Sequence, residues 1–335
     1  MGSAILGCLI GVTIAGSLSD KYGRKPLMII AAITFTVSAI GTGAVNDLNW
    51  FIFYRIFGGI GIGIASNLSP MYIAEVSPSH VRGKFVSINQ LTIVLGILAA
   101  QFVNWLIAEP VVPGENILET WNGQMGWRWM FWAEVVPSAL FFILIFFIPE
   151  SPRWLATKLQ YGKAENILSH IGGKEYAKKE IESIKTVISA TKEKLNIRML
   201  FQGKIPGILL IGIVIAAFQQ WCGLNVVFNY AQEIFAAAGY GVSDILFNIV
   251  VTGVTNVIFT FVGMYTVDKL GRRSLMLFGA SGLAIIYIIM GICYYLNITG
   301  MAVLIMVVLA IACYAMTLAP VSYTHLRAHE TSAHL

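Results

Sequence analysis

Two segments of this sequence repeat an acid, a glycine and a group of bases in the same order. The first is DKYGRK at 20–25, and the second is DKLGRR at 268–273. Each segment follows a long apolar run, so its charges lie where a hydrophobic helix would end. A negative charge at Asp20 is disfavoured by the helix dipole unless a base pairs with it. Arg24 or Lys25 could form that ion pair.

Glu75, which ends another apolar run, offers either base an alternative partner. Exposed ion pairs are often worth less than about 1 kcal/mol, and the bases could serve only to orient the chain in a membrane. Because an acid and a glycine recur together with the bases, we expect more than orientation. Ion pairs at this position could hold neighbouring helices together at the membrane surface.

Several amide side chains lie inside apolar runs, where polar groups are costly and therefore point to function, and five of them are candidate ligands. They are Gln90, Gln219, Gln220, Asn225 and Asn256. An amide both donates and accepts hydrogen bonds, which suits a neutral ligand rich in hydroxyl groups. Gly223 lies between Gln220 and Asn225 and could interrupt the helix there. Alternatively, the amides join helices, an interaction worth about 0.6 kcal/mol on average.

Two charged residues also lie inside apolar runs. Arg55 could extend its side chain to the membrane surface. Glu134 could take part in proton transfer, or it could be a partner of nearby polar groups.

The elements that must hold these residues are membrane-spanning helices. The sequence is 57% hydrophobic and 12% charged, with a mean hydropathy of +0.75, whereas soluble domains are about 25% charged. A spanning helix needs about 20 mostly apolar residues. Such runs occupy residues 2–19, 27–45, 50–74, 84–108, 128–148, 205–231, 244–267, 274–296 and 300–320. The sequence therefore predicts an all-α membrane protein with about nine spans.

The basic residues predict which loops face the cytoplasm. All of the 22 Lys and Arg residues except Arg55, Arg128 and Arg327 lie in alternate loops, which are therefore expected to be cytoplasmic. This distribution, rather than the net charge of +5, argues for a lipid bilayer as partner and against nucleic acid. The four cysteines lie inside the apolar runs, so we infer no disulfide and no metal site from them. No cofactor motif is visible in the sequence, and we expect no cofactor.

The longest polar segment, 149–204, divides the apolar runs into two groups. It predicts a helical cytoplasmic linker between a transmembrane half at 1–148 and another at 205–320. The second charged motif follows two spans of its half, whereas the first follows only one. If the halves are related, a parent protein would have two halves of six helices. Here its first helix and its last two would be missing, leaving native helices 2 to 10.

The last fifteen residues differ from the rest of the chain. Residues 321–335 are polar and contain three of the five histidines. They resemble a translated sequencing adapter, so we expect them to be artefactual and assign them no function.

The motifs together resemble the sugar porters of the major facilitator superfamily, which include bacterial sugar–proton symporters and animal glucose facilitators. Besides the two charged motifs, the resemblance rests on YRIFGGIGIG (54–63), PMYIAEVSPSHVRG (70–83), INQ (88–90), PESPRWL (149–155) and QQWCGLN (219–225). It implies the major facilitator fold and a cytoplasmic gate of ion pairs that latches the two halves. The gate residues would be Asp20, Arg24, Glu75, Arg82, Glu150, Arg153, Asp268, Arg272 and Arg273.

The resemblance also implies a function. We expect transport of a monosaccharide by alternating access, with the five amides as sugar ligands and Arg55 and Glu134 in proton coupling. A uniporter or a transporter-like sugar sensor are the alternatives, and no enzyme activity is expected. The partners would be a monosaccharide and protons, with the chain as a monomer. Two departures from the family pattern, Ile97 in place of a Gln and Asn229 in place of a Tyr, leave the sugar undetermined.

Overall fold

The computed structural model describes residues 2–78, 81–111, 116–190, 205–298 and 300–332. Across these ranges the chain forms helices and no strand. Nine of the described helical segments are long and apolar enough to cross a membrane. The structure therefore confirms the predicted all-α class and the predicted number of spans.

The chain packs as two compact units. The first comprises Met1–Asn89 with Gly123–Leu195, and the second comprises Gln90–Asn122 with Asn196–Leu335. The predicted division into halves at 149–204 follows chain order rather than packing, and it stays a prediction.

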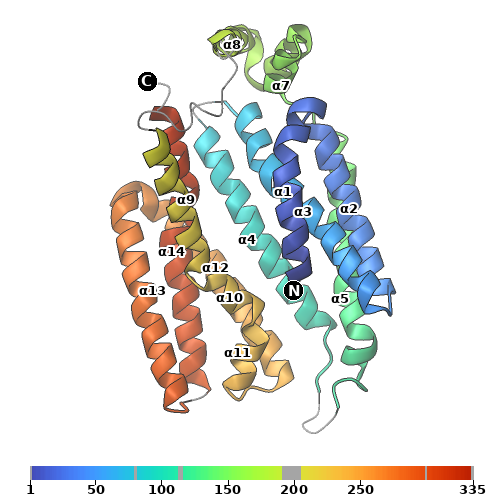
Figure 1. Ribbon diagram of the computed structural model, residues 1–335, viewed down its shortest axis with the longest axis vertical. Coiled ribbons are helices and arrows are strands. Elements are labelled where there is room, and N and C mark those ends of the chain that lie inside the picture. The colour runs from blue at the N-terminus through green and yellow to red at the C-terminus, as the bar shows by residue number, and fades with distance from the viewer. Residues whose placement is uncertain (1, 79–80, 112–115, 191–204, 299, 333–335) are drawn as a thin grey trace. The chain divides into compact units, whose positions relative to one another are not determined.

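Three long helices form the centre of the first unit and run side by side in Figure 1. They are α1 (Gly2–Tyr22), α2 (Arg24–Ala44) and α3 (Leu48–Val76). The backbones of α1 and α3 are in contact through glycines. A Cβ on Gly7 would lie 2.1 Å from the Ile56 carbonyl oxygen, and one on Gly59 would lie 2.2 Å from the Ala4 carbonyl oxygen. The glycines of the 54–63 motif thus permit this close approach, as small residues do between membrane helices.

The remaining elements of the first unit include a broken transmembrane segment and two helices in the predicted linker. They are a short π-helix at Asn122–Gly126, α5 (Trp127–Ala133), α6 (Val135–Ile145), α7 (Pro152–Thr157) and α8 (Tyr161–Ala190). Figure 1 shows α7 and α8 beyond one end of the α1–α3 group. The rest of the predicted linker, 191–204, lies outside the described residues.

The second unit is formed by α4 (Arg82–Ile107, from Gln90 on) and the helices that follow the predicted linker. Those helices are α9 (Ile205–Trp221), α10 (Leu224–Asn229), α11 (Ala231–Ala237), α12 (Val242–Leu270), α13 (Arg272–Tyr295) and α14 (Met301–Ser332). Its apolar core joins Phe235, which is fully buried, to Val303, Val307 and Ile311 of α14. The backbone of α14 continues through 321–332, and the expectation that this segment is artefactual stays a prediction.

Candidate functional site

The first charged motif folds as a tight turn between two helices. α1 ends at Tyr22, α2 begins at Arg24, and Gly23 between them has a φ of 101°. A Cβ on Gly23 would lie only 2.4 Å from Oε2 of Glu150. Glycine is therefore required here both by the positive φ and by the approach of a carboxylate.

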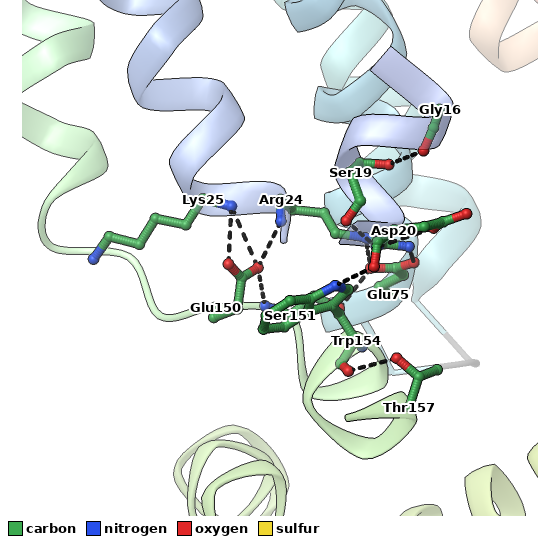
Figure 2. Close-up of polar contacts among 10 residues, drawn as sticks. All are labelled: Gly16, Ser19, Asp20, Arg24, Lys25, Glu75, Glu150, Ser151, Trp154 and Thr157. Carbon is green, nitrogen blue, oxygen red and sulfur yellow. Dashed lines mark hydrogen bonds and ion pairs between the residues drawn. The ribbon is translucent and has the colours of Figure 1, made fainter. Parts of the chain in front are cut away.

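The Arg24 guanidinium is paired mainly with Glu75 of α3. Its Nε donates to Glu75 Oε2 at 3.0 Å and its Nη2 to Oε1 at 2.9 Å, and both side chains are 9% exposed. Arg24 Nη1 also donates to the Ser19 carbonyl at 2.9 Å and to Asp20 Oδ1 at 3.4 Å. The Asp20 side chain is 79% exposed, so Glu75 is the principal partner (Figure 2).

The start of α7 is bonded to the same group. The Ser151 hydroxyl donates to Glu75 Oε2 at 2.5 Å, and the Trp154 indole donates to the Asp20 carbonyl at 3.1 Å. The Arg24 network thus ties α1, α2, α3 and α7 together, all within the first unit.

Glu150 binds a helix end rather than a base. Its carboxylate accepts the backbone N–H of Arg24 at 2.9 Å, of Lys25 at 3.2 Å and of Ser151 at 2.8 Å. The positive end of the α2 dipole stabilises a carboxylate in this position. The Lys25 ammonium donates instead to the Phe146 carbonyl at 2.9 Å, so Lys25 is not the base that pairs with Glu75. Figure 2 shows Glu150 beneath the first residues of α2.

The other predicted gate residues are less engaged. Arg82 Nη2 donates to the Ser77 carbonyl at 3.5 Å, and Arg153 and Arg273 are exposed. The side chains of Asp268 and Arg272 lie outside the described residues. The structure thus brings together Asp20, Arg24, Glu75 and Glu150 of the predicted set.

A cavity of about 510 Å³ adjoins the Glu150 cap. Its lining includes Tyr22, Trp154, Gln160 and Lys163, from α1, α7 and α8 and the α7–α8 turn. Because none of the five amides lines this cavity, it is separate from the expected sugar site.

The two charges expected in proton coupling both lie in the first unit. Glu134 lies at the junction of α5 and α6, and the Arg55 charge acts on it electrostatically. The Arg55 guanidinium carbon lies 5.4 Å from the centre of the Phe131 ring, on the helix that ends beside Glu134. The structure therefore places Arg55 and Glu134 within electrostatic reach of one another, with an aromatic ring against the base.

The predicted helix break in the second unit is confirmed. Gly223 adopts the left-handed conformation, with φ 81° and ψ −4°, between the end of α9 and the start of α10. Across this break the Asn225 amide nitrogen donates to Oε1 of Gln220. A straight helix would hold side chains five residues apart about 140° from one another. The break is what allows these two amides to meet.

The remaining amides occupy the same unit in different settings. Gln219 Nε2 donates to the Tyr314 hydroxyl of α14 at 3.3 Å. Asn256 is buried on α12, and Gln90 is half-buried on α4. Among the described residues, none of the other three amides forms a hydrogen bond with Gln90 or with Asn256.

Several polar groups of the second unit are not among the residues predicted from the sequence. Tyr287 and Tyr314 lie beside the helix break, and α12 buries a further polar series comprising Asn248, Thr252, Thr255 and Thr260. A tyrosine in an apolar run gives no distinct signal, because most tyrosines there pack as aromatic residues. The α12 series could have been found from its helical spacing.

Comparison with known proteins identifies the family. A family model described as "Sugar (and other) transporter" matches residues 1–332. The D-xylose-proton symporter of Escherichia coli K12 is 37% identical over 96% of the chain, which spans 68% of that protein. The arabinose-proton symporter of Bacillus subtilis is 35% identical over the same shares. A glucose transport protein of Synechocystis is 40% identical over 84% of the chain and 60% of its own length.

Solved structures agree with this result. A partially occluded inward-open structure of the xylose transporter XylE from E. coli superposes with a TM-score of 0.85 and 35% identity. That match covers 98% of this chain and 75% of the other. The chain therefore belongs to the sugar transporter family and has the major facilitator fold. It is a multi-pass membrane protein. Its sequence covers about two thirds of the length of its curated relatives.

Proposed function

We propose that this protein transports a monosaccharide across the cell membrane by alternating access, coupled to proton symport. The observation that carries the proposal is the break at Gly223, across which Gln220 and Asn225 meet. Interrupted helices at membrane depth are typical of transporter binding sites, because they free polar groups for a ligand. The curated relatives include transporters named for xylose, arabinose and glucose.

The proposed sugar ligands are Gln90, Gln219, Gln220, Asn225 and Asn256. Gln220 and Asn225 are exposed on their helices, and each keeps hydrogen-bonding capacity beyond the bond that joins them. Sugar hydroxyl groups both donate and accept, so they can use the amide oxygens and nitrogens together. No charge is needed at such a site, which fits a neutral substrate.

The proposed proton-coupling residues are Arg55 and Glu134. A carboxylate can bind and release a proton, and a neighbouring base stabilises the charged form of that carboxylate. Protonation of Glu134 would weaken its attraction to Arg55 and so link proton binding to the packing of α3 against α5. Relatives named as proton symporters support this assignment.

The proposed gate is the Arg24 network. Its bonds fasten α1, α2, α3 and α7 into one body, which would move as a unit during the transport cycle. This network of ion pairs would favour the outward-open state.

A uniporter is the second candidate, because a glucose facilitated diffusion protein of Zymomonas mobilis is 31% identical over 96% of the chain. Uptake of radiolabelled D-xylose, L-arabinose and D-glucose into proteoliposomes separates the two. A symporter accumulates its sugar when an inward proton gradient is imposed, and a uniporter only equilibrates it. Absence of saturable uptake of all three sugars by the full-length protein would contradict the proposal as a whole.

A further inference from the structure

Tyr287 presents an unused hydrogen-bonding group at the helix break. It lies on α13, and its hydroxyl oxygen is buried without a hydrogen-bond partner among the described residues. A Cβ placed on Gly223 would lie 3.4 Å from this oxygen and 3.6 Å from the ring carbon that bears it. The phenol is thus directed at the residue that interrupts the proposed binding helix.

The neighbours of Tyr287 connect it to the proposed sugar ligands. Its polar neighbours include Cys222, Cys313 and Tyr314, and the Tyr314 hydroxyl accepts the bond from Gln219. Both thiols are already directed at backbone carbonyls, Cys222 at Phe218 and Cys313 at Gly279. The Tyr287 hydroxyl therefore stands beside the ligand-bearing segment with its capacity to donate and accept intact.

A second tyrosine of the same helix shows the ordinary arrangement. Tyr294, two turns further along α13, donates its hydroxyl to the Ile234 carbonyl of α11 at 3.1 Å. Buried polar groups are normally satisfied in this way, because an unpaired hydroxyl away from water is costly. The contrast between Tyr287 and Tyr294 calls for a partner that binds at the break.

We propose that the Tyr287 hydroxyl hydrogen-bonds one hydroxyl group of the transported sugar and contributes to the choice of sugar. This inference rests on the proposed function. A neutral ligand that brings a hydroxyl to Gly223 would give the Tyr287 hydroxyl a hydrogen-bond partner only while the ligand is bound. The free energy of that hydrogen bond would therefore contribute directly to the affinity for the ligand. Sites built to bond a ligand hydroxyl discriminate strongly against analogues that lack it.

The test combines two variants with a series of sugars. Whichever of D-xylose, L-arabinose and D-glucose the full-length protein binds most tightly is titrated calorimetrically, together with its monodeoxy derivatives. Tyr287→Phe removes only the hydroxyl, and Tyr294→Phe is the matched control on the same helix. Melting temperatures are recorded for both.

The expected results for the two variants are opposite. Tyr287→Phe weakens binding of the parent sugar about fivefold or more, leaves the melting temperature unchanged or higher, and binds one particular monodeoxy sugar as tightly as the parent protein does. Tyr294→Phe lowers the melting temperature and leaves the affinity unchanged, because its hydroxyl bonds a structural carbonyl.

Two outcomes would overturn the inference. Unchanged affinity in Tyr287→Phe would show that the hydroxyl does not contact the sugar. An equal loss for the sugar and for every monodeoxy derivative would show that Tyr287 acts only through the fold at Gly223. Gln220→Ala and Asn225→Ala are titrated in parallel: if they weaken binding while Tyr287→Phe does not, the inference alone fails, and if none of the three sugars binds, the proposed function fails too.

Discussion

Arg24 of α2 and Glu75 of α3, which are 51 residues apart in the chain, form a two-bond ion pair. Both side chains are 9% exposed, and Glu75 also accepts the Ser151 hydroxyl. The pair Arg24–Asp20, only four residues apart, is longer at 3.4 Å, and its acid is 79% exposed. A buried pair of this kind should therefore dominate the energetics of the turn.

The first prediction compares the two acids that face Arg24. Glu75→Ala leaves a buried guanidinium without its main counter-charge, and breaking such a pair costs about 3–5 kcal/mol. Asp20→Ala removes a mostly exposed partner, for which about 0–1 kcal/mol is typical. Equilibrium unfolding of the purified variants in mixed micelles measures both losses. Equal losses in the two variants would contradict the assignment of Glu75 as the principal partner.

The second prediction uses the repeat of the charged motif. Gly23 and Gly271 both have positive φ, 101° and 76°, but a Cβ on Gly23 would lie 2.4 Å from the Glu150 carboxylate, whereas one on Gly271 would meet no atom of the described residues within 4 Å. Gly271→Ala should show backbone strain alone, about 1–3 kcal/mol, because its φ of 76° and ψ of 149° lie in a region that is nearly restricted to glycine. Gly23→Ala should lose more, because it also displaces the cap of α2.

Melting temperatures of the two glycine variants provide the measurement. A third variant, Glu150→Ala combined with Gly23→Ala, serves as the control for the collision. If the new Cβ at position 23 collides with the Glu150 carboxylate, the losses of stability from Gly23→Ala and Glu150→Ala are less than additive, because Glu150→Ala already removes that carboxylate. Identical losses for Gly23→Ala and Gly271→Ala would mean that the carboxylate moves aside without cost.

Some of this arrangement is readable from the sequence. Nine spans follow from the length of the apolar runs, and the break at Gly223 follows from a glycine between two amides. The turn at Gly23 likewise follows from a glycine between apolar helices. These features are local, so neighbouring residues along the chain determine them.

The pairing of charges is not local, and the sequence left it open. From the sequence alone, Asp20 and Glu75 are equally plausible partners of Arg24. The structure decides between them, because Glu75 is buried with Arg24 and also accepts a hydrogen bond from Ser151. Glu150 was expected in a gate of ion pairs, yet it caps α2 from a segment 126 residues away. Tyr287 was not expected from the sequence, because only the packing of α13 beside Gly223 brings its hydroxyl close to the helix break.

The third prediction concerns proton coupling. Glu134→Gln preserves the size of the side chain near Arg55 but cannot carry a proton. We expect sugar accumulation driven by a proton gradient to be lost, while exchange of labelled for unlabelled sugar is retained. Glu109→Gln, an exposed acid outside the helices, is the matched control and should accumulate sugar normally. Accumulation by Glu134→Gln at the parent level would remove Glu134 from the coupling mechanism.

The last prediction concerns the two amides that meet across the helix break. Asn225 donates to Gln220, and in the proposed complex each would also bond a sugar hydroxyl. Removal of one leaves a ligand hydroxyl unpaired in a site from which water is excluded, at a cost of about 1–3 kcal/mol. Gln220→Ala and Asn225→Ala should therefore each weaken sugar binding by roughly 5- to 150-fold. Gln232→Ala, an exposed amide on α11, is the matched control and should bind as the parent does.

Because Gln220 and Asn225 bond each other, the double variant gives the sharper result. If each amide orients the other, the loss in Gln220→Ala/Asn225→Ala should fall short of the combined single losses. Calorimetric titration measures the affinities, and size-exclusion profiles and melting temperatures confirm that each variant is folded. If both single variants bind as Gln232→Ala does, the bond across Gly223 serves only to hold α9 and α10 together, and the sugar binds elsewhere.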